Sequence, residues 1–371
     1  MSIARTDNST LGRWWWSVDK WTLVALLALA AMGVVLAMAA SPPVAERIGL
    51  DPLHFVQRQA VYLPMAVVIM LGVSLMSPVG ARRLAIIVFL GAVVLLMMTL
   101  VGGTEIKGAR RWLNVSSLSL QPSEFVKPAL AVVCAWMFAA KRLGAEIPGN
   151  LISFCLYALV AALLLLQPDV GQALVVSAVW FSQWFLAGLP MIWVAVACAV
   201  GIAGLTAAYF IFPHVASRID RFIDPAAGDN YQTDKAMEAF MNGGLWGRGP
   251  GEGTVKTNLP DAHADFILAV AGEEFGLIVC LVIVAIFAFV VLRGFANLMR
   301  TTDLFVVIAS TGLLVQFALQ ALINMGSTVS LMPTKGMTLP FISYGGSSLL
   351  ALAFGMGILL ALTRTPAGAA A

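Results

Sequence analysis

Charged side chains are scarce in this sequence. Asp, Glu, Lys and Arg make up 11% of its 371 residues, whereas a soluble domain has about 25%. Hydrophobic residues make up 60% instead, which excludes a single water-soluble core. The formal net charge is only +3, so no basic surplus favours nucleic acid as a partner.

Cysteine is also rare. Four cysteines lie inside apolar runs, and no two of them have C-x-x-C spacing. This argues against a zinc site and against an external disulfide framework, and it predicts that the cysteines pack against lipid or core. The cysteines are Cys134, Cys155, Cys198 and Cys280.

The sequence also shows no internal repeat of fixed period, so it gives no support to an inverted-repeat transporter.

Long apolar runs take up most of the chain. A bilayer core of ~30 Å requires about 20 apolar helical residues, and ten nearly uncharged runs approach that length. The sequence therefore predicts an all-α, polytopic membrane protein whose transmembrane domain covers residues 21–363. A largely polar segment precedes the first run, which we therefore expect to be retained as an anchor and not cleaved as a signal peptide. The predicted spans are Trp21–Ala40, Ala60–Val79, Leu84–Val101, Pro122–Ala140, Leu151–Leu166, Gly171–Ala187, Ile192–Phe212, Phe266–Val291, Leu304–Ile323 and Gly345–Leu362.

Basic residues in short loops predict the orientation, because they accumulate on the cytoplasmic side. Placing segment 1–20 in the cytoplasm puts most of them there, and an even number of spans brings the tail 364–371 to the same side. Trp14, Trp15, Trp16 and Trp21 are typical of an interfacial aromatic belt. The predicted inner set is Arg5, Arg13, Lys20, Arg82, Arg83, Lys141, Arg142, Arg293, Arg300 and Arg364. Four cations fall on the outer side against this rule: Lys107, Arg110, Arg111 and Lys335.

One outer loop, residues 213–265, is far longer than the others. Its Gly, Pro and charge content cannot cross a bilayer, and long loops in compact proteins are commonly functional. It contains an amphipathic helix candidate around Asp234–Met241. A glycine-punctuated stretch, Gly243–Gly253, follows, and we expect it to be mobile and either to close over a bound molecule or to release it.

Two groups of charges lie near the fourth span. Glu124 and Lys127 are three residues apart on the helix that Pro122 opens, so they share one face. They either neutralise one another structurally or present Lys127 to a ligand, since ionisable groups in a membrane require a partner or a task. Arg110 and Arg111 precede them, and their guanidinium groups either bind phosphate oxygens or extend to lipid headgroups.

Asp265 ends the long outer loop and begins an apolar helix. Asp is a good N-cap residue, so helix capping by Asp265 is the alternative to a chemical role. However, His263 stands two residues earlier, and Glu273 and Glu274 follow two turns later. Glu273 and Glu274 are either paired structural carboxylates or part of one pocket with Asp265, in which several ionisable groups converge.

Polar breaks mark two further outer segments. Residues 324–348 contain prolines, glycines and hydroxyls at membrane depth, which is tolerated where the backbone is buried in protein or lines a wet cavity. Lys335, Ser343 and Tyr344 lie in this segment. Residues 167–172 form the second break, in which Asp169 has the position of a turn residue.

Five motifs together resemble the SEDS family of bacterial cell-wall glycosyltransferases, and the resemblance covers essentially all spans. Residues 332–344 are similar to its division branch more than to its elongation branch. The motifs are RWL from Arg111, QPSEFVK over Gln121–Lys127, QPD over Gln167–Asp169, LPDAHADFI over Leu259–Ile267 with Glu273 and Glu274, and LPFISYGGS over Leu339–Ser347.

The resemblance implies inverting polymerisation of lipid II into glycan strands outside the inner membrane during division, with release of undecaprenyl diphosphate. Asp265 is then the general base that activates a sugar hydroxyl. Arg110, Arg111, Lys127 and Lys335 would hold the pyrophosphate, and Glu124 would orient Lys127. His263, Ser343 and Tyr344 would contact substrate. A divalent cation, Mg²⁺ or Mn²⁺, would assist, although no metal-ligand spacing predicts a protein metal site.

The resemblance also implies partners and leaves two rival functions open. The partners are a class B penicillin-binding transpeptidase of the FtsI type, division-complex membrane proteins of the FtsQ, FtsL and FtsB type, and membrane lipids. One rival is a lipid II flippase, which would carry polar groups through the inner half of the bundle, whereas those here are predicted in the outer half. The other is a noncatalytic division scaffold, which would not need Asp265.

Overall fold

A computed structural model describes residues 9–106, 109–115, 118–224 and 230–364. The N-terminal residues 1–8, Lys107 and the tail from 365 on lie outside this part. All ten predicted runs are helical. Eight of the helices have at least 18 residues, and two have 17. The ten helices are α2 (Lys20–Arg47), α3 (His54–Ser74), α4 (Pro78–Gly102), α5 (Pro122–Arg142), α6 (Gly149–Leu166), α7 (Val170–Leu186), α8 (Met191–Ile211), α11 (Ile267–Leu298), α12 (Leu304–Thr328) and α13 (Gly346–Leu362).

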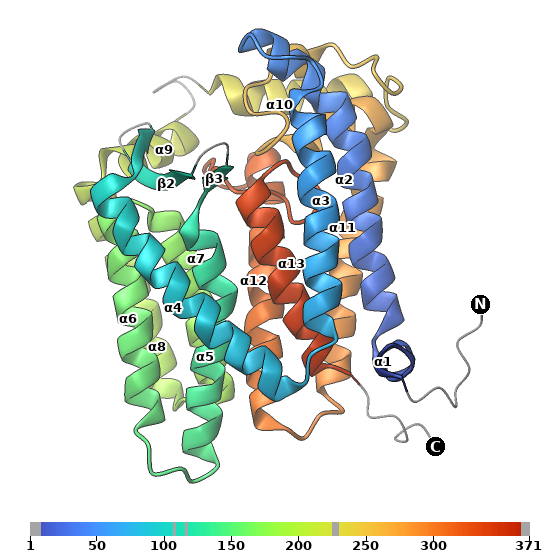
Figure 1. The fold of residues 1–371 in the computed structure, drawn as a ribbon. Helices are drawn as coiled ribbons and strands as arrows, with labels where there is room; N and C mark the ends of the chain where they lie inside the picture. The colour runs from blue at the N-terminus through green and yellow to red at the C-terminus, as the bar shows by residue number, and fades with distance from the viewer. Residues whose placement is uncertain (1–8, 107–108, 116–117, 225–229, 365–371) are drawn as a thin grey trace.

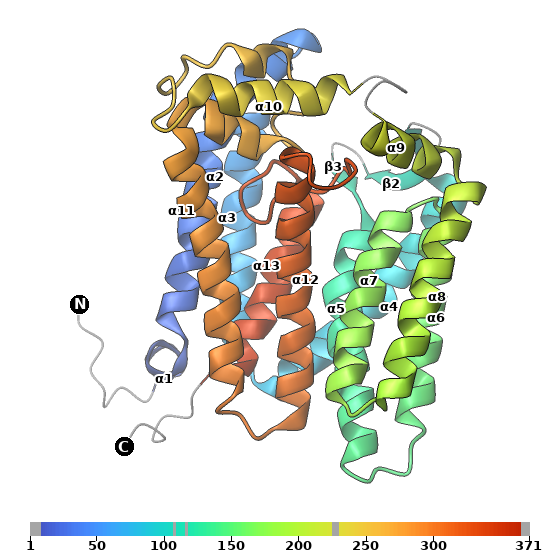
Figure 2. The same ribbon diagram turned by 180° about the vertical axis from the view of Figure 1, so that it is seen from behind.

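The helices run up and down between two ends of the molecule (Figure 1). The short helix α1 (Thr10–Ser17) and the end of α13 lie at one end. At the opposite end lie α9 (Pro213–Ile223), α10 (Tyr231–Gly243) and the 3-10 helix η2 (Val255–Asn258) of the long loop (Figures 1 and 2). The described basic residues of the predicted inner set therefore share the α1 end. The helix predicted at 234–241 is confirmed within α10.

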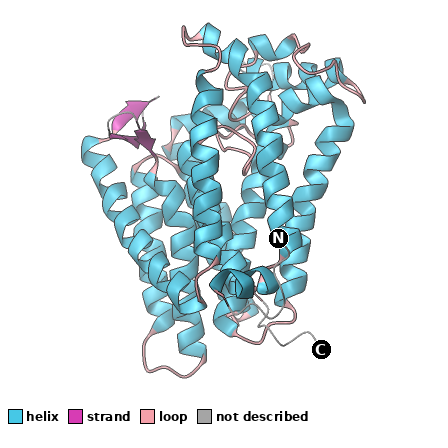
Figure 3. Cartoon of the chain, turned by 45° about the vertical axis from the view of Figure 1, so that its right-hand side comes forward, coloured by secondary structure: helices cyan, strands magenta, loops and turns pink. Residues whose placement is uncertain are grey.

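Two local features differ from the prediction. The second span is α3, which ends at Ser74, before the predicted end at Val79. The next helix begins early: Ser77 caps α4 by accepting a hydrogen bond from the Gly80 amide at 3.2 Å, and Pro78 is its first residue. Residues 104–120 also form a small antiparallel sheet of β1 (Thr104–Ile106), β2 (Ala109–Val115) and β3 (Leu118–Leu120), in the order β1-β2-β3. Figure 3 shows this sheet beside an otherwise helical molecule.

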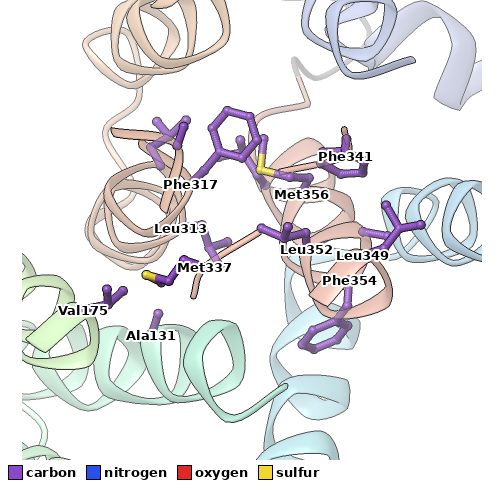
Figure 4. Packing of buried hydrophobic residues seen from close by; sticks show 14 of the residues in the cluster. Ala131, Val175, Leu313, Phe317, Met337, Phe341, Leu349, Leu352, Phe354 and Met356 are labelled. Carbon is purple, nitrogen blue, oxygen red and sulfur yellow. The ribbon is translucent and has the colours of Figure 1, made fainter. Parts of the chain in front are cut away.

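The core lies around α5, α12 and α13. Almost every side chain of α13 is buried, and α13 packs mainly on α3 and α5. The segment between α12 and α13 re-enters this core, since Met337, Leu339 and Phe341 are at most 3% exposed. Figure 4 shows Met337 facing Ala131 of α5 and Val175 of α7. Of the two alternatives for this polar-rich segment, burial in protein therefore holds for these side chains.

The outward-facing helices expose apolar side chains. Along α8, Ala208 is the one buried residue among the side chains that are described. Cys134 and Cys280 are buried, whereas Cys155 and Cys198 are exposed on apolar helices, as expected for core-facing and lipid-facing packing residues. A multi-pass membrane protein requires such an apolar surface.

Candidate active site

Asp265 lies just before α11, at the end of the molecule that carries the long loop. The N-cap residue of α11 is Phe266, which makes no side-chain capping bond, so Asp265 is not the N-cap. Its side chain is half-buried, and its Oδ2 lies 3.0 Å from where a Cβ on Gly336 would stand. The carboxylate therefore rests against the backbone of the segment between α12 and α13.

Buried hydrogen bonds hold the backbone around Asp265. Asn324 of α12 is fully buried, and its amide donates to the carbonyl oxygens of Asp265 at 2.9 Å and Met337 at 2.7 Å. The Ser343 hydroxyl donates to the Ala264 carbonyl at 2.5 Å and accepts from the Leu339 amide at 2.8 Å. These bonds join the two segments that carry Asp265 and Lys335, and they commit the predicted substrate residue Ser343 to contacts within the protein.

His263 lies in an aromatic cluster. Its ring stacks on Phe55 of α3 at 4.1 Å between centroids, and the ring of Tyr344 is 5.5 Å away. Burial lowers the pKa of His263 to about 4, so the imidazole is neutral near pH 7. Its Nδ1 is buried and has no hydrogen-bond partner in the described part of the chain. Burial raises the pKa of the Tyr344 hydroxyl, and the nearby Arg58 guanidinium partly opposes this effect.

Glu124 and Lys127 form the predicted pair on α5. Lys127 Nζ donates to Glu124 Oε2 at 3.0 Å, and both residues are at most 5% exposed. Gln172 of α7 donates to the other Glu124 oxygen at 2.6 Å. The expectation that these two residues share a face and pair is confirmed by the geometry.

The two predicted arginines point to different surroundings, because successive residues of a strand face opposite sides. Arg111 is half-buried; its guanidinium donates to the Gln167 and Pro168 carbonyl oxygens and lies 3.6 Å from Asp169 Oδ2. Arg110 is exposed and pairs with Glu105 at 3.3 Å. Of these two arginines, only Arg111 therefore belongs to the charged group near Asp169. Asp169 also caps α7, because its side chain accepts a hydrogen bond from the Gln172 amide.

Lys335 joins these charges. Its side chain lies against Gly171 at the start of α7, where the charges of Asp169, Lys127 and Glu124 act on it. Burial lowers its pKa to about 7, so part of the ammonium loses its proton near neutral pH. An anion bound beside Lys335 would restore its charge, because an opposite charge favours the protonated form.

Comparison with known proteins identifies the family. Residues 20–367 match the family FTSW_RODA_SPOVE, described as "Cell cycle protein". The chain belongs to the FtsW/RodA/SpoVE family. It is 45% identical to "Probable peptidoglycan glycosyltransferase FtsW" of Caulobacter vibrioides, over 99% of this chain and 95% of the relative. The FtsW of the same description from Escherichia coli O6:H1 is 33% identical, over 92% of this chain and 85% of that protein.

Solved structures show the same architecture. One chain, from a structure described as "Structural coordination of polymerization and crosslinking by a peptidoglycan synthase complex", aligns with a TM-score of 0.77 and 27% identity, over 93% of this chain and 97% of that chain. The rod shape determining protein RodA of Thermus thermophilus aligns with a TM-score of 0.67 and 27% identity, over 94% and 97%. The ten-span arrangement is thus that of the FtsW/RodA/SpoVE family.

Of the two alternatives for Glu273 and Glu274, a pocket shared with Asp265 is not supported, because both carboxylates bind other groups. Glu273 accepts hydrogen bonds from the backbone amides of Thr254, Val255 and Lys256 at 2.7–2.9 Å, and Glu274 pairs with the Lys256 ammonium. The alternative, in which they are structural carboxylates, holds. They secure the loop around η2 to α11, which the sequence did not reveal because the bonded amides are backbone groups.

The glycine stretch 243–253 was expected to be mobile, but the structure fastens it to α11. Gly276 has φ 78° and interrupts that helix, which frees backbone groups on either side. The Leu277 amide donates to the Gly244 carbonyl at 2.9 Å, and the Arg248 amide donates to the Glu273 carbonyl at 2.9 Å. Since buried backbone groups must be paired in a membrane protein, this stretch completes the broken helix.

Asn324, which no sequence pattern singled out, holds the backbone of Asp265 and Met337. We expect Asn324→Ala to lower turnover by up to ~10²-fold, because small displacements of a catalytic group have effects of that size, and to destabilise the fold by about 1–3 kcal/mol. Gln320→Ala is the matched control, since Gln320 bonds Thr338 and Ser348 one turn away. Polymerisation rates and thermal unfolding of both variants check this, and equal rate losses would contradict it.

Proposed function

We propose that this chain is a peptidoglycan glycosyltransferase that polymerises lipid II into glycan strands at the division septum. The observation that carries the proposal is the position of Asp265. Its half-buried carboxylate lies at the loop end of the bundle against Gly336, the residue after Lys335. The charges of Lys127 and Asp169 act on Lys335, and Asp169 in turn pairs with Arg111. The names of the FtsW relatives support the assignment to division.

In the proposed reaction, Asp265 accepts the proton of a sugar hydroxyl as its oxygen attacks the anomeric carbon of another lipid-linked sugar. A new C–O bond forms with inversion, and the bond from that carbon to the diphosphate breaks. Undecaprenyl diphosphate leaves with the electron pair, and the nearby cations stabilise the charge that develops. Asp265 then returns its proton to water.

A divalent cation would neutralise the departing diphosphate further. In the described residues, no group of three His, Cys, Asp or Glu side chains is arranged to hold a metal. We therefore assign such a cation mainly to the phosphate oxygens of the substrate, as is common for Mg²⁺.

Location and partnership follow from the same proposal. The chain lies in the inner membrane with the α1 end in the cytoplasm and Asp265 outside, which agrees with the basic residues at the α1 end. A class B transpeptidase is the proposed partner, supported by the similar chain from a peptidoglycan synthase complex of polymerisation and crosslinking. Partners of the FtsQ, FtsL and FtsB type are proposed from the division assignment alone.

The function is tested with the purified full-length chain, its transpeptidase partner and fluorescent lipid II. We expect polymer on gels in detergent, because the charged group and Asp265 suffice for transfer. A parallel liposome assay measures lipid II movement between leaflets. Headgroup translocation without polymer would support the flippase, and the absence of both activities together with recruitment of the transpeptidase would support the scaffold.

A further inference from the structure

Helix α9 carries two arginines that no sequence motif singled out. Arg218 and Arg221 are three residues apart, so they share one face of this amphipathic helix. Both line an open cavity of about 640 Å³ between α9, the start of α10 and the segment that follows α12. Figure 2 shows α9 above α7 and α8, at the end of the molecule that carries the long loop.

Arg218 lies between this cavity and the charges already described. The charges of Arg111, Asp265 and Asp169 all act on its guanidinium. Its side chain is half-buried, and within the described ranges it makes no hydrogen bond or ion pair. Burial and the neighbouring arginines lower its pKa. Asp265 and Asp169 oppose part of this effect, and an anion bound beside the partly desolvated guanidinium would favour its charged form further.

The remaining cavity wall suits a sugar. Asn230, Thr233, Ser330 and Thr334 supply amide and hydroxyl groups, and Tyr231 adds an aromatic ring. A volume of about 640 Å³ falls within the range of small-molecule sites, roughly 300–1,000 Å³. The cavity therefore combines saccharide-compatible walls with two guanidinium groups on one side.

We propose that Arg218 binds the diphosphate of a lipid-linked saccharide, with Arg221 extending the site and the saccharide occupying the cavity. This inference rests on the proposed function. Guanidinium groups match phosphate oxygens in two-bond geometry. A peptide carboxylate fits less well, because the diphosphate is bonded directly to the reacting carbon and so stays near Asp265, although it leaves from the face opposite the attacking hydroxyl.

Binding is measured in the full-length chain carrying Asp265→Asn, so that turnover does not interfere. Fluorescent lipid II is displaced by undecaprenyl diphosphate or by undecaprenyl monophosphate. Arg218→Ala should weaken lipid II and diphosphate binding about tenfold or more, the effect of losing a charge-assisted hydrogen bond, and should reduce the preference for diphosphate over monophosphate. Arg218→Lys should recover part of both. Lys235→Ala, which removes a cation paired with Glu238 on the surface of α10, should bind as the parent does.

The outcomes separate the two proposals. If Arg218→Ala keeps the preference for diphosphate over monophosphate, the inference is overturned. It is also overturned if the variant loses binding of both competitors equally and unfolds at a lower temperature, because that result identifies a structural role. In a chain that keeps Asp265, Arg218→Ala should raise KM for lipid II more than it lowers kcat. If Asp265→Asn alone still polymerises lipid II at the parent rate, the assignment of Asp265 as the base fails. This result is independent of the binding results for Arg218.

Discussion

Replacing Asp265 by Asn is expected to lower glycan polymerisation about 10²–10⁴-fold, the usual contribution of a positioned general base. Asn keeps the shape of the side chain beside Gly336 but cannot take a proton from a sugar hydroxyl. The backbone bonds from Asn324 to Asp265 and from Ser343 to Ala264 are unaffected, so the fold should persist. Rates with fluorescent lipid II and the transpeptidase partner measure the effect, with lipid II binding and thermal unfolding measured on the same samples.

Asp261→Asn is the matched control, because Asp261 is a carboxylate four residues earlier in the same loop. Asp261 has φ 53°, a left-handed conformation that Asn tolerates well. We expect near-parent polymerisation in this variant. Equal losses in the two variants would show a general sensitivity of the loop to charge and would remove Asp265 from its assigned role, as would parent-like turnover of Asp265→Asn.

Breaking the buried pair on α5 should have the largest effect on stability. Lys127→Met leaves the Glu124 carboxylate buried with Gln172 as its remaining described partner. Removal of one member of a buried ion pair typically costs ~3–5 kcal/mol. We expect a loss of that order in the free energy of unfolding, measured in detergent, together with loss of polymerisation.

The double variant Glu124→Gln with Lys127→Met separates structure from chemistry. Removing both charges should recover most of the stability, since replacing a whole buried pair is often neutral, but activity should stay low because the Lys127 ammonium no longer meets the diphosphate. Recovery of activity along with stability would leave the pair with the structural role alone. Lys235→Met, which breaks an exposed i, i+3 pair with Glu238, should not change unfolding measurably.

Features that depend on local sequence were predictable. The apolar runs predicted ten helices because a backbone in lipid must satisfy its own hydrogen bonds. The spacing of Glu124 and Lys127 predicted their pairing because three residues bring side chains to one helical face. Proline and glycine in the segment before α13 indicated that it leaves the helical form, and the need for satisfied polar groups left burial in protein or the lining of a wet cavity as the alternatives.

Features that depend on contacts between distant segments were not predictable. The pairing of Glu273 with amides 17–19 residues away and the placement of Phe55 against His263 both require the folded chain. The contact of 243–249 with α11 at the Gly276 interruption was also not predictable, because the glycine residues alone indicate only a flexible loop.

By itself, the sequence determined the membrane class and the helices, because composition and periodicity act within one segment, and its motifs carried the family resemblance that implies Asp265 as the base. Only the tertiary structure decided which charges share a site: Arg111 faces Asp169 while Arg110 turns to Glu105, and Arg218 comes beside Asp265 from a different helix. The physical reason is that electrostatic interactions depend on distance through space, and that distance is set by how α5, α7, α9 and α12 pack together.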